Sequence, residues 1–210
     1  LANISIAMET LARQSRSENE PNSKVYKILG QETERLRENI EKILQVARFE
    51  KEKINLSYEK LDVHSVIQKA ASSFEPVLQG RNAELKFDFN ASQPVIEADE
   101  THLINIVCNL IDNSIKYSTN GLRLQIRTEN FRDGVMFSVK DNGEGISKEE
   151  QKRIFEKFYR ANNSDIHTVK GFGLGLTYVK TIVESHRGKI IVRSLPSVGS
   201  EFQIYLPFNQ

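Results

Sequence analysis

Apolar residues recur at helical intervals in the first quarter of the chain. Ile4, Met8 and Leu11 are spaced by four and three residues, so they share one face of a helix. Polar residues and Pro21, between positions 15 and 23, then interrupt the pattern. A second stripe follows at mostly the same intervals, formed by Val25, Leu29, Leu36, Ile40, Ile43 and Ala47. The pattern predicts two helices that are joined by a short turn and lie antiparallel.

The apolar stripes of this hairpin are too narrow to be buried by the hairpin alone. We expect two copies of the chain to pair through residues 1–58 into a four-helix bundle, which would make the protein a homodimer. In the alternative, the hairpin packs on the rest of its own chain.

After Ile54 the pattern changes to short alternating strands and amphipathic helices. Strands are expected at residues 85–89, 122–128, 135–141, 190–192 and 202–206, with a short apolar piece at Val95 and Ile96. Helices are expected at residues 63–79, 100–117 and 174–186. Gly134 falls in a tight turn between two strands, and Gly188 is expected to be the C′ residue of the last helix. Strands joined by tight turns favour a mixed, largely antiparallel sheet with helices on one face.

Composition narrows the class of protein. The 29 Lys and Arg residues nearly balance the 28 Asp and Glu residues, which argues against binding to nucleic acid through bulk charge. Cys108 is the single cysteine, so an internal disulfide framework is excluded. The longest apolar stretch, about residues 103–111, is too short to span a bilayer, and the first ten residues lack the pattern of a signal peptide. We therefore expect a cytoplasmic protein with no direct nucleic-acid partner and no membrane contact through these residues.

Three asparagines share one side of the helix expected at residues 100–117. Asn105, Asn109 and Asn113 are spaced by four residues, although asparagine is a poor helix former. Amide oxygens can hold Mg²⁺ while water and phosphate oxygens fill its other positions. The stripe could equally be a solvated polar face or a set of hydrogen bonds between helices.

The segment DNGEGI, residues 141–146, directly follows an expected strand. Asp141 occupies the inward side of that strand, where a carboxylate must find hydrogen-bond donors. The exocyclic amine of an adenine is one candidate donor. Gly143 and Gly145 would let the backbone turn sharply and approach a ligand closely. The alternative is a strand-to-loop turn in which the protein itself satisfies Asp141.

Glycines precede the last expected helix in the segment GFGLGL, residues 171–176. Glycines at a helix N-terminus leave backbone N–H groups free to face an anion. Their spacing fits neither a dinucleotide fingerprint nor a P-loop. The polar stretch at residues 157–170 is typical of a lid. The segment FEKFYR, residues 155–160, adds aromatic side chains and Arg160, which could reach a phosphate.

The order of these segments is more specific than any one of them. NLIDNSIKY (residues 109–117), DNGEGI, FEKFYR and GFGLGL resemble the N, G1, F and G2 boxes of sensor histidine kinases of bacterial two-component systems. The ATP-binding domain of those kinases belongs to the GHKL (Bergerat) superfamily. The resemblance extends to HRGKI at 186–190 and GSEF at 199–202, and it covers residues 59–210. Residues 1–58 resemble an N-terminally incomplete dimerisation and histidine-phosphotransfer hairpin.

This resemblance implies an α+β chain, in which the hairpin precedes an α/β-sandwich domain that binds ATP between the N-box helix and the lid. Asn109 would ligate Mg²⁺, and Asn113 and Lys116 would lie near the phosphates. Tyr117 would lie beside the nucleotide, and Asp141 would accept a hydrogen bond from the adenine amine. The remaining residues of the implied nucleotide site are Gly143, Gly145, Ile146, Tyr159, Arg160, Gly171, Gly173, Leu174, Gly175 and Leu176.

The implied activity is that of a protein-histidine kinase, with relay of the phosphate to an aspartate in the receiver domain of a response regulator. In the family the acceptor histidine lies on the first hairpin helix. Here the four histidines are His64, His102, His167 and His186, and none lies in the hairpin. We expect the acceptor and its neighbouring acidic residue upstream of Leu1, in a parent protein that an upstream region anchors in a membrane.

Two other functions stay open at this point. The chain could be a non-catalytic module that dimerises and binds nucleotide without transferring phosphate. An ATPase or chaperone-like clamp of the same superfamily fits less well, because the hairpin precedes the ATP domain and no transducer domain follows it.

Overall fold

The computed structural model describes residues 55–118, 121–160 and 173–209, together with Gly30 and Thr33. The chain divides into two units, residues 1–53 and 54–210. Gly30 and Thr33 are helical, while the rest of the expected hairpin and its dimer contacts lie outside the described residues. All the other described residues belong to the second unit. None of the helices within these ranges is long and apolar enough to cross a membrane.

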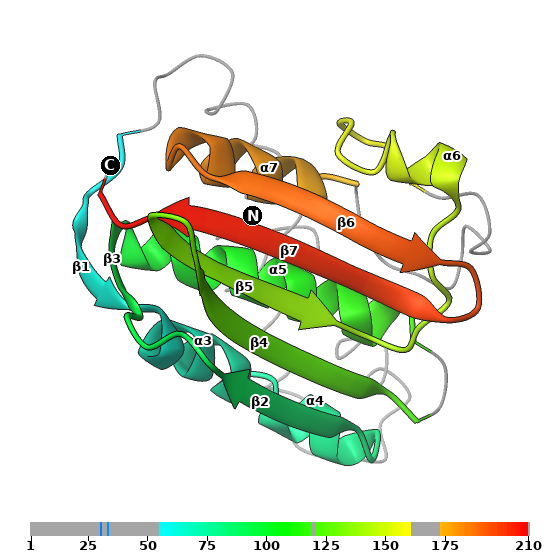
Figure 1. The fold of residues 1–210 in the computed structure, drawn as a ribbon. Helices are drawn as coiled ribbons and strands as arrows, with labels where there is room; N and C mark the ends of the chain where they lie inside the picture. The colour runs from blue at the N-terminus through cyan, green and yellow to red at the C-terminus, as the bar shows by residue number, and fades with distance from the viewer. Residues whose placement is uncertain (1–29, 31–32, 34–54, 119–120, 161–172, 210) are drawn as a thin grey trace. The chain divides into compact units, whose positions relative to one another are not determined.

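A mixed five-stranded sheet forms the frame of the second unit (Figure 1). Its strands are ordered β2 (Glu84–Phe89), β4 (Arg123–Phe131), β5 (Gly134–Lys140), β7 (Gly199–Pro207) and β6 (Lys189–Leu195). The β2–β4 pair is parallel and the other pairs are antiparallel, which confirms the expected sheet type. The β4–β5 hairpin has the expected tight turn, in which Arg132 adopts a φ of +54°.

A second, two-stranded sheet lies beside the frame. It pairs β1 (Glu59–Asp62) with β3 (Val95–Ala98) in antiparallel register. The apolar piece at Val95 and Ile96 belongs to β3, whereas no pattern in the sequence indicated β1. Four residues with a single half-buried position, Leu61, are too few for an alternation to be visible.

Helices α3 (Val63–Ser72), α5 (Glu100–Lys116) and α7 (Gly175–Ser185) cover one face of the large sheet (Figure 1). On that face Ile126 stands beside Val139, and Val139 beside Phe202. Together with Leu110 of α5 and Val179 of α7, these side chains are almost completely buried. Burying each one stabilises the fold by about 1.5–3 kcal/mol, so this layer fixes α5 and α7 against the sheet.

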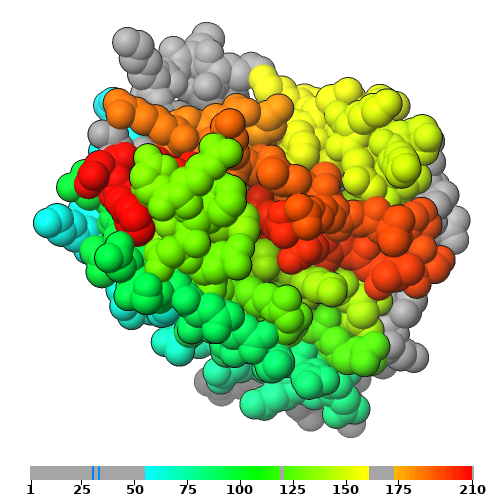
Figure 2. Space-filling view, viewed as in Figure 1, coloured from blue at the N-terminus to red at the C-terminus, as the bar shows by residue number. Residues whose placement is uncertain are grey.

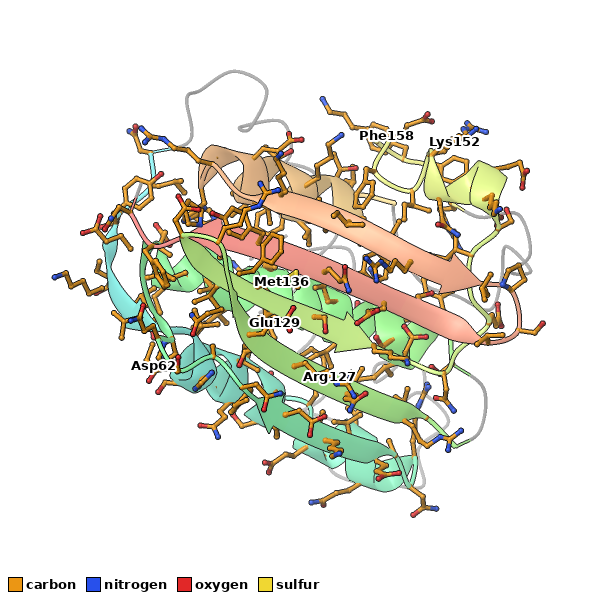
Figure 3. The ribbon with its side chains drawn as sticks, in the orientation of Figure 1. Asp62, Arg127, Glu129, Met136, Lys152 and Phe158 are labelled. Atoms are coloured by element: carbon orange, nitrogen blue, oxygen red, sulfur yellow. The ribbon has the colours of Figure 1, made fainter. Side chains whose placement is uncertain are left out.

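The opposite face of the sheet carries no helix among the described residues (Figure 1), and its side chains form part of the surface seen in Figure 2. Arg127 and Glu129 of β4 and Met136 of β5 lie on this face (Figure 3). There the carboxylate of Asp88 in β2 accepts hydrogen bonds from Gln125 and Arg127. A sheet buried on one face only explains why apolar and polar residues alternate along its strands.

The single helix expected at residues 63–79 is two helices. α3 ends at Ser72, and the six-residue α4 runs from Glu75 to Gly80. Pro76 lies in the first turn of α4. In a continuous helix it would have no N–H for the carbonyl of Ser72, and its ring would collide with that carbonyl. Because the apolar spacing continues across the break, periodicity alone gave the wrong result.

The end of the last helix also differs from the prediction. His186 is the C-cap of α7, and the residue in the left-handed conformation is Arg187, at φ +51°. Gly188 donates its N–H to the carbonyl of Val183 at 2.8 Å. A Cβ at Gly188 would meet the carbonyl oxygen of Tyr205. Gly188 is therefore needed for close approach to β7, and the prediction that it is the C′ residue is wrong.

Candidate functional site

A cleft of about 510 Å³ opens beside the loop that follows β5. Its walls come from the C-terminal end of α5, that loop, α6 (Lys148–Gln151), the start of α7 and the turn between β6 and β7. Residues of the expected site that line it are Asn113, Tyr117, Asp141, Gly143, Gly145, Ile146, Tyr159, Arg160 and Leu176. The other lining residues are Asn142, Glu144, Ser147, Glu150, Ile154, Pro196, Ser197, Ser200 and Phe202. The volume and the mixed lining suit a small organic ligand.

Asp141 is the buried acid of this cleft, with only 9% of its surface exposed. Its Oδ1 accepts hydrogen bonds from the N–H of Gly143 at 2.8 Å and of Ser200 at 3.2 Å. Burial raises the pKa of Asp141, although the donors on Gly143, Ser200 and Ser114 oppose the rise. The carboxylate is thus half satisfied by the protein, through one of its two oxygens.

The second oxygen of Asp141 has a weaker set of contacts. Among the described residues, its Oδ2 meets only the hydroxyl of Ser114, at 3.4 Å. That hydroxyl lies closer to the carbonyl of Leu110, at 3.0 Å, and a hydroxyl has one proton to give. Oδ2 therefore lacks a strong donor in a buried position. An N–H group of a ligand in the cleft would supply one.

The loop at residues 141–146 is held tightly by its own neighbours. A Cβ at Gly143 would lie 2.5 Å from the carbonyl oxygen of Tyr117, and one at Gly145, whose φ is +70°, would meet the carbonyl of Leu195. The backbone of Glu144 bridges both sides, because its N–H donates to Tyr117 at 3.0 Å and its carbonyl accepts from Ser197 at 2.6 Å. The two glycines are required by this packing, which fixes the shape of the wall beside Asp141.

The asparagine stripe of α5 faces the start of α7. Asn109 donates its side-chain N–H to the carbonyl of Asn105 at 2.8 Å, which leaves its Oδ1 as the available acceptor. A Cβ at Gly175 would lie 2.7 Å from that oxygen. Asn113, one turn further along α5, lines the cleft, whereas Asn109 does not. The asparagine stripe is therefore neither a fully solvated face nor a set of side chains that all bond to another helix.

Lys116 does not line the cleft either. Its ammonium group pairs with the carboxylate of Asp112 one helical turn earlier, and about a third of the Lys116 side chain, 31%, is exposed. This i, i+4 pair is of the weak surface kind. Lys116 can therefore leave Asp112 at small cost if a phosphate comes within reach.

The lid side of the cleft is described as far as Arg160. Tyr159 and Arg160 both line the cleft, and the guanidinium of Arg153 lies over the ring of Tyr159, 4.3 Å from its centre. Beyond the gap, Gly173 has a φ of +69° and packs against the carbonyl of Tyr159. Leu176 lines the cleft, while Gly173, Leu174 and Gly175 do not. Gly171 lies outside the described residues.

The sequence analysis did not predict that residues of α6 and β7 form part of the wall of the cleft. Ser147 and Glu150 form a capping box, in which each side chain accepts a hydrogen bond from the backbone N–H of the other, at 3.3 Å and 3.0 Å. Serine followed by Glu three residues later is a readable signal for a helix start. Ser200 and Phe202 of β7 enter the cleft because β7 pairs with β5 next to Asp141.

Known proteins are similar in sequence to the part of this chain that forms the cleft. Residues 98–210 match the family described as histidine kinase-, DNA gyrase B-, and HSP90-like ATPase. The sensor protein RprX of Bacteroides fragilis is 41% identical over 182 residues. That alignment covers 86% of this chain but 35% of RprX, so the chain spans about a third of that relative's length.

Solved structures share the fold. Full-length ShkA in complex with AMPPNP superposes with a TM-score of 0.82 at 22% identity, over 97% of this chain and 46% of ShkA. The histidine kinase ThkA in complex with the response regulator protein TrrA superposes with a TM-score of 0.71 at 22% identity, over 99% of this chain and 57% of that one. At these identities the likeness concerns the fold.

Proposed function

Because the chain belongs to the histidine kinase-, DNA gyrase B- and HSP90-like ATPases, in the branch of the sensor histidine kinases, we propose that its cleft binds Mg-ATP for transfer of the γ-phosphate to a histidine. The phosphate would then pass to an aspartate of a response regulator. The observation that carries the proposal is the buried carboxylate of Asp141, which lines the cleft and has one oxygen without a strong donor among the described residues.

The end of the cleft at Asp141 suits an adenine base. Oδ2 of Asp141 would accept a hydrogen bond from the exocyclic amine, which would supply the donor that the protein does not. The apolar side chains of Ile146, Leu176 and Phe202 in the lining would pack on the ring. This acceptor role requires the ionised carboxylate. Because burial raises the pKa of Asp141, nucleotide binding should weaken as the pH falls through that raised value.

The other end suits phosphates. α7 begins at Gly175, and the N–H groups of a helix N-terminus favour an anion. Lys116 and Arg160 would add positive charge, and Asn113, which lines the cleft, would add an amide near the phosphates. Phosphoryl transfer depends on positioning and on neutralising charge. These groups would hold the triphosphate rather than take part in covalent chemistry.

A magnesium ion fits the residues present. Among the described residues there is no cluster of three His, Cys, Asp or Glu side chains that could hold a metal. Asn109 presents an amide oxygen toward Gly175, and Mg²⁺ is commonly held by one or two protein oxygens with water and phosphate oxygens. When bound, the ion would neutralise phosphate charge. Asn109 would be its protein ligand.

None of the described histidines suits the role of phosphoacceptor. His186 is 1% exposed, and both of its ring nitrogens are engaged, with the N–H of Asp99 and the carbonyl of Ile182. His64 bonds to Thr128, and His102 bonds to Tyr178. We propose that the acceptor lies upstream of Leu1, in the part of the first hairpin helix that this chain does not include, as the sequence analysis expects.

Two partners belong to the proposal. The hairpin would pair with a second copy of the chain, and the receiver domain of a response regulator would take the phosphate. The complex of ThkA with the response regulator protein TrrA supports the second partner. Measuring the molar mass of the chain in solution by light scattering tests the first, since a monomer would contradict it.

Calorimetric titration with Mg-ATP tests the nucleotide site. In Asp141→Asn, Oδ1 would keep the two backbone donors and the new N–H₂ group would face the adenine amine, so two donors would oppose each other. We expect affinity to fall about tenfold or more, as for loss of a charged hydrogen bond. Asp88→Asn, on the open face of the sheet, is the matched control and should bind as the wild type does. Equal affinity of Asp141→Asn and the wild type would contradict the proposal.

A non-catalytic nucleotide-binding module is the second candidate, because a cleft that binds nucleotide does not by itself require phosphate transfer. A longer version of the protein, extended upstream to include a histidine in the first helix, separates the two. Acid-labile phosphohistidine formed from radioactive ATP supports the kinase. ATP binding without any phosphate transfer supports the module.

A further inference from the structure

Asn142 lies beside Asp141 and joins two segments that are distant in sequence. Its Oδ1 accepts a hydrogen bond from the N–H of Arg123 at 2.7 Å, and its Nδ2 donates to the carbonyl of Gly121 at 3.0 Å. Gly121 belongs to the connection between α5 and β4, and Arg123 is the first residue of β4. Asn142 also lines the cleft, so a single amide ties the loop after β5 to the chain that follows α5.

The loop that carries Asn142 and the C-terminal end of α5 both contribute walls of the cleft. Tyr117, the C-cap of α5, lies in one wall, and Gly143 and Glu144 lie in the other. Another hydrogen bond between them runs from the N–H of Glu144 to the carbonyl of Tyr117, at 3.0 Å. The distance of 2.5 Å between that carbonyl and a Cβ at Gly143 shows how little room separates them. The amide of Asn142 thus adds two hydrogen bonds to those that hold the loop at this distance from the end of α5.

We propose that Asn142 is a positioning residue of the nucleotide cleft, which sets the spacing between Tyr117 and the Asp141 loop. This inference rests on the proposed function, because it assigns a role toward the nucleotide that the cleft would hold. The role requires an amide, since one side chain must accept from an N–H and donate to a carbonyl at once. An aspartate keeps the acceptor but turns a charged oxygen toward the carbonyl of Gly121.

Asn130 offers a matched control on the far end of the β4–β5 hairpin. It makes the same pair of bonds, accepting from the N–H of Gln93 at 2.9 Å and donating to its carbonyl at 2.8 Å. Asn130 does not line the cleft. The change Asn130→Asp therefore removes an equivalent donor and adds an equivalent charge, away from the proposed nucleotide.

The experiment measures the dissociation constant of Mg-ATP by calorimetry for the wild type, Asn142→Asp, Asn142→Ala and Asn130→Asp. At about pH 7.5 we expect both Asn142 variants to bind about five- to tenfold more weakly, as for one or two lost hydrogen bonds. Asn130→Asp should stay within about twofold of the wild type. Thermal unfolding of all four proteins shows whether each is folded at the temperature of the titration.

A pH series separates positioning from a general loss of structure. Protonation of the carboxylate introduced by Asn142→Asp restores an O–H donor for the carbonyl of Gly121. The ratio of the dissociation constant of this variant to that of the wild type should therefore shrink as the pH is lowered toward about 5, because a carboxylate beside a carbonyl titrates above its ordinary value. The ratio for Asn142→Ala should stay flat, since alanine does not titrate.

Each outcome decides the inference. Wild-type affinity in the Asn142 variants, equal weakening in Asn130→Asp, or a flat ratio in Asn142→Asp would each overturn it while leaving the nucleotide site intact. If the wild type itself does not bind Mg-ATP, the proposed function fails instead. Hydrogen exchange at the amide of Arg123 still tests the clamp in that case, because exchange should accelerate in Asn142→Ala and stay slow in Asn142→Asp.

Discussion

The contact between Gly175 and Asn109 leads to a prediction in which stability and ligand binding separate. In Gly175→Ala the new Cβ would lie 2.7 Å from Oδ1 of Asn109, whereas ordinary contacts begin near 3.4 Å. One of the two must move by about 0.7 Å. The side chain of Asn109 is held by its hydrogen bond to the carbonyl of Asn105, so its displacement costs about 1 kcal/mol. Alanine gains about 0.5–1 kcal/mol over glycine in a helix.

These opposing effects leave the free energy of unfolding of Gly175→Ala within about 1 kcal/mol of the wild type. The displaced Asn109 should nevertheless reduce the contribution of Mg²⁺ to ATP affinity, by about tenfold, as for a shifted metal ligand. Urea unfolding measures the first quantity, and calorimetry with and without Mg²⁺ measures the second. Gly80→Ala is the control, because a Cβ there meets nothing within 4 Å. An unchanged dependence on Mg²⁺ in Gly175→Ala would refute the assignment of Asn109.

Three further predictions concern stability. Burial lowers the pKa of His186 below its ordinary 6.5, so the unfolded chain binds the proton more tightly than the folded chain does. The free energy of unfolding should therefore fall as the pH drops below about 6.5, and it should fall less in His186→Asn. Urea unfolding midpoints at about pH 7.5 and 5.5 measure this difference. Gly145→Ala, at φ +70° and against the carbonyl of Leu195, should cost more than about 2 kcal/mol and abolish Mg-ATP binding, whereas wild-type binding would contradict the packing of that loop. Asp62→Ala removes the cap that accepts from two N–H groups of α3 and should cost about 1 kcal/mol in unfolding without changing ATP affinity.

The sequence predicted the strands and helices whose apolar spacing is long and uninterrupted. The helix at residues 100–117 and the hairpin around Gly134 are confirmed, because burial on one face of the sheet requires the alternation that the sequence carries. The break at Pro76 was missed, since apolar residues continue across it. β1 was missed because a four-residue strand is stabilised by its partner β3 rather than by its own pattern.

The environment of a site residue could be predicted from the sequence where the chemistry of its side chain allows few alternatives. Asp141 was expected to be buried and in need of donors, and it is. The side-chain partners of Asn109 and Lys116 were not predictable, because each depends on a choice between neighbours at the same helical spacing. Asn142 was overlooked for a related reason, since its partners lie about twenty residues away and only the folded chain brings them together.

The central claim is that Oδ2 of Asp141 accepts a hydrogen bond from the exocyclic amine of an adenine. It is tested most directly by exchanging donor and acceptor on the nucleotide and, separately, on residue 141. Inosine triphosphate has a carbonyl oxygen where ATP has the amine, and Asp141→Asn would present a donor where the wild type presents an acceptor. Calorimetry should show that the wild type prefers ATP by about tenfold or more and that Asp141→Asn loses or reverses this preference. The same ratio of affinities in both proteins would contradict the claim.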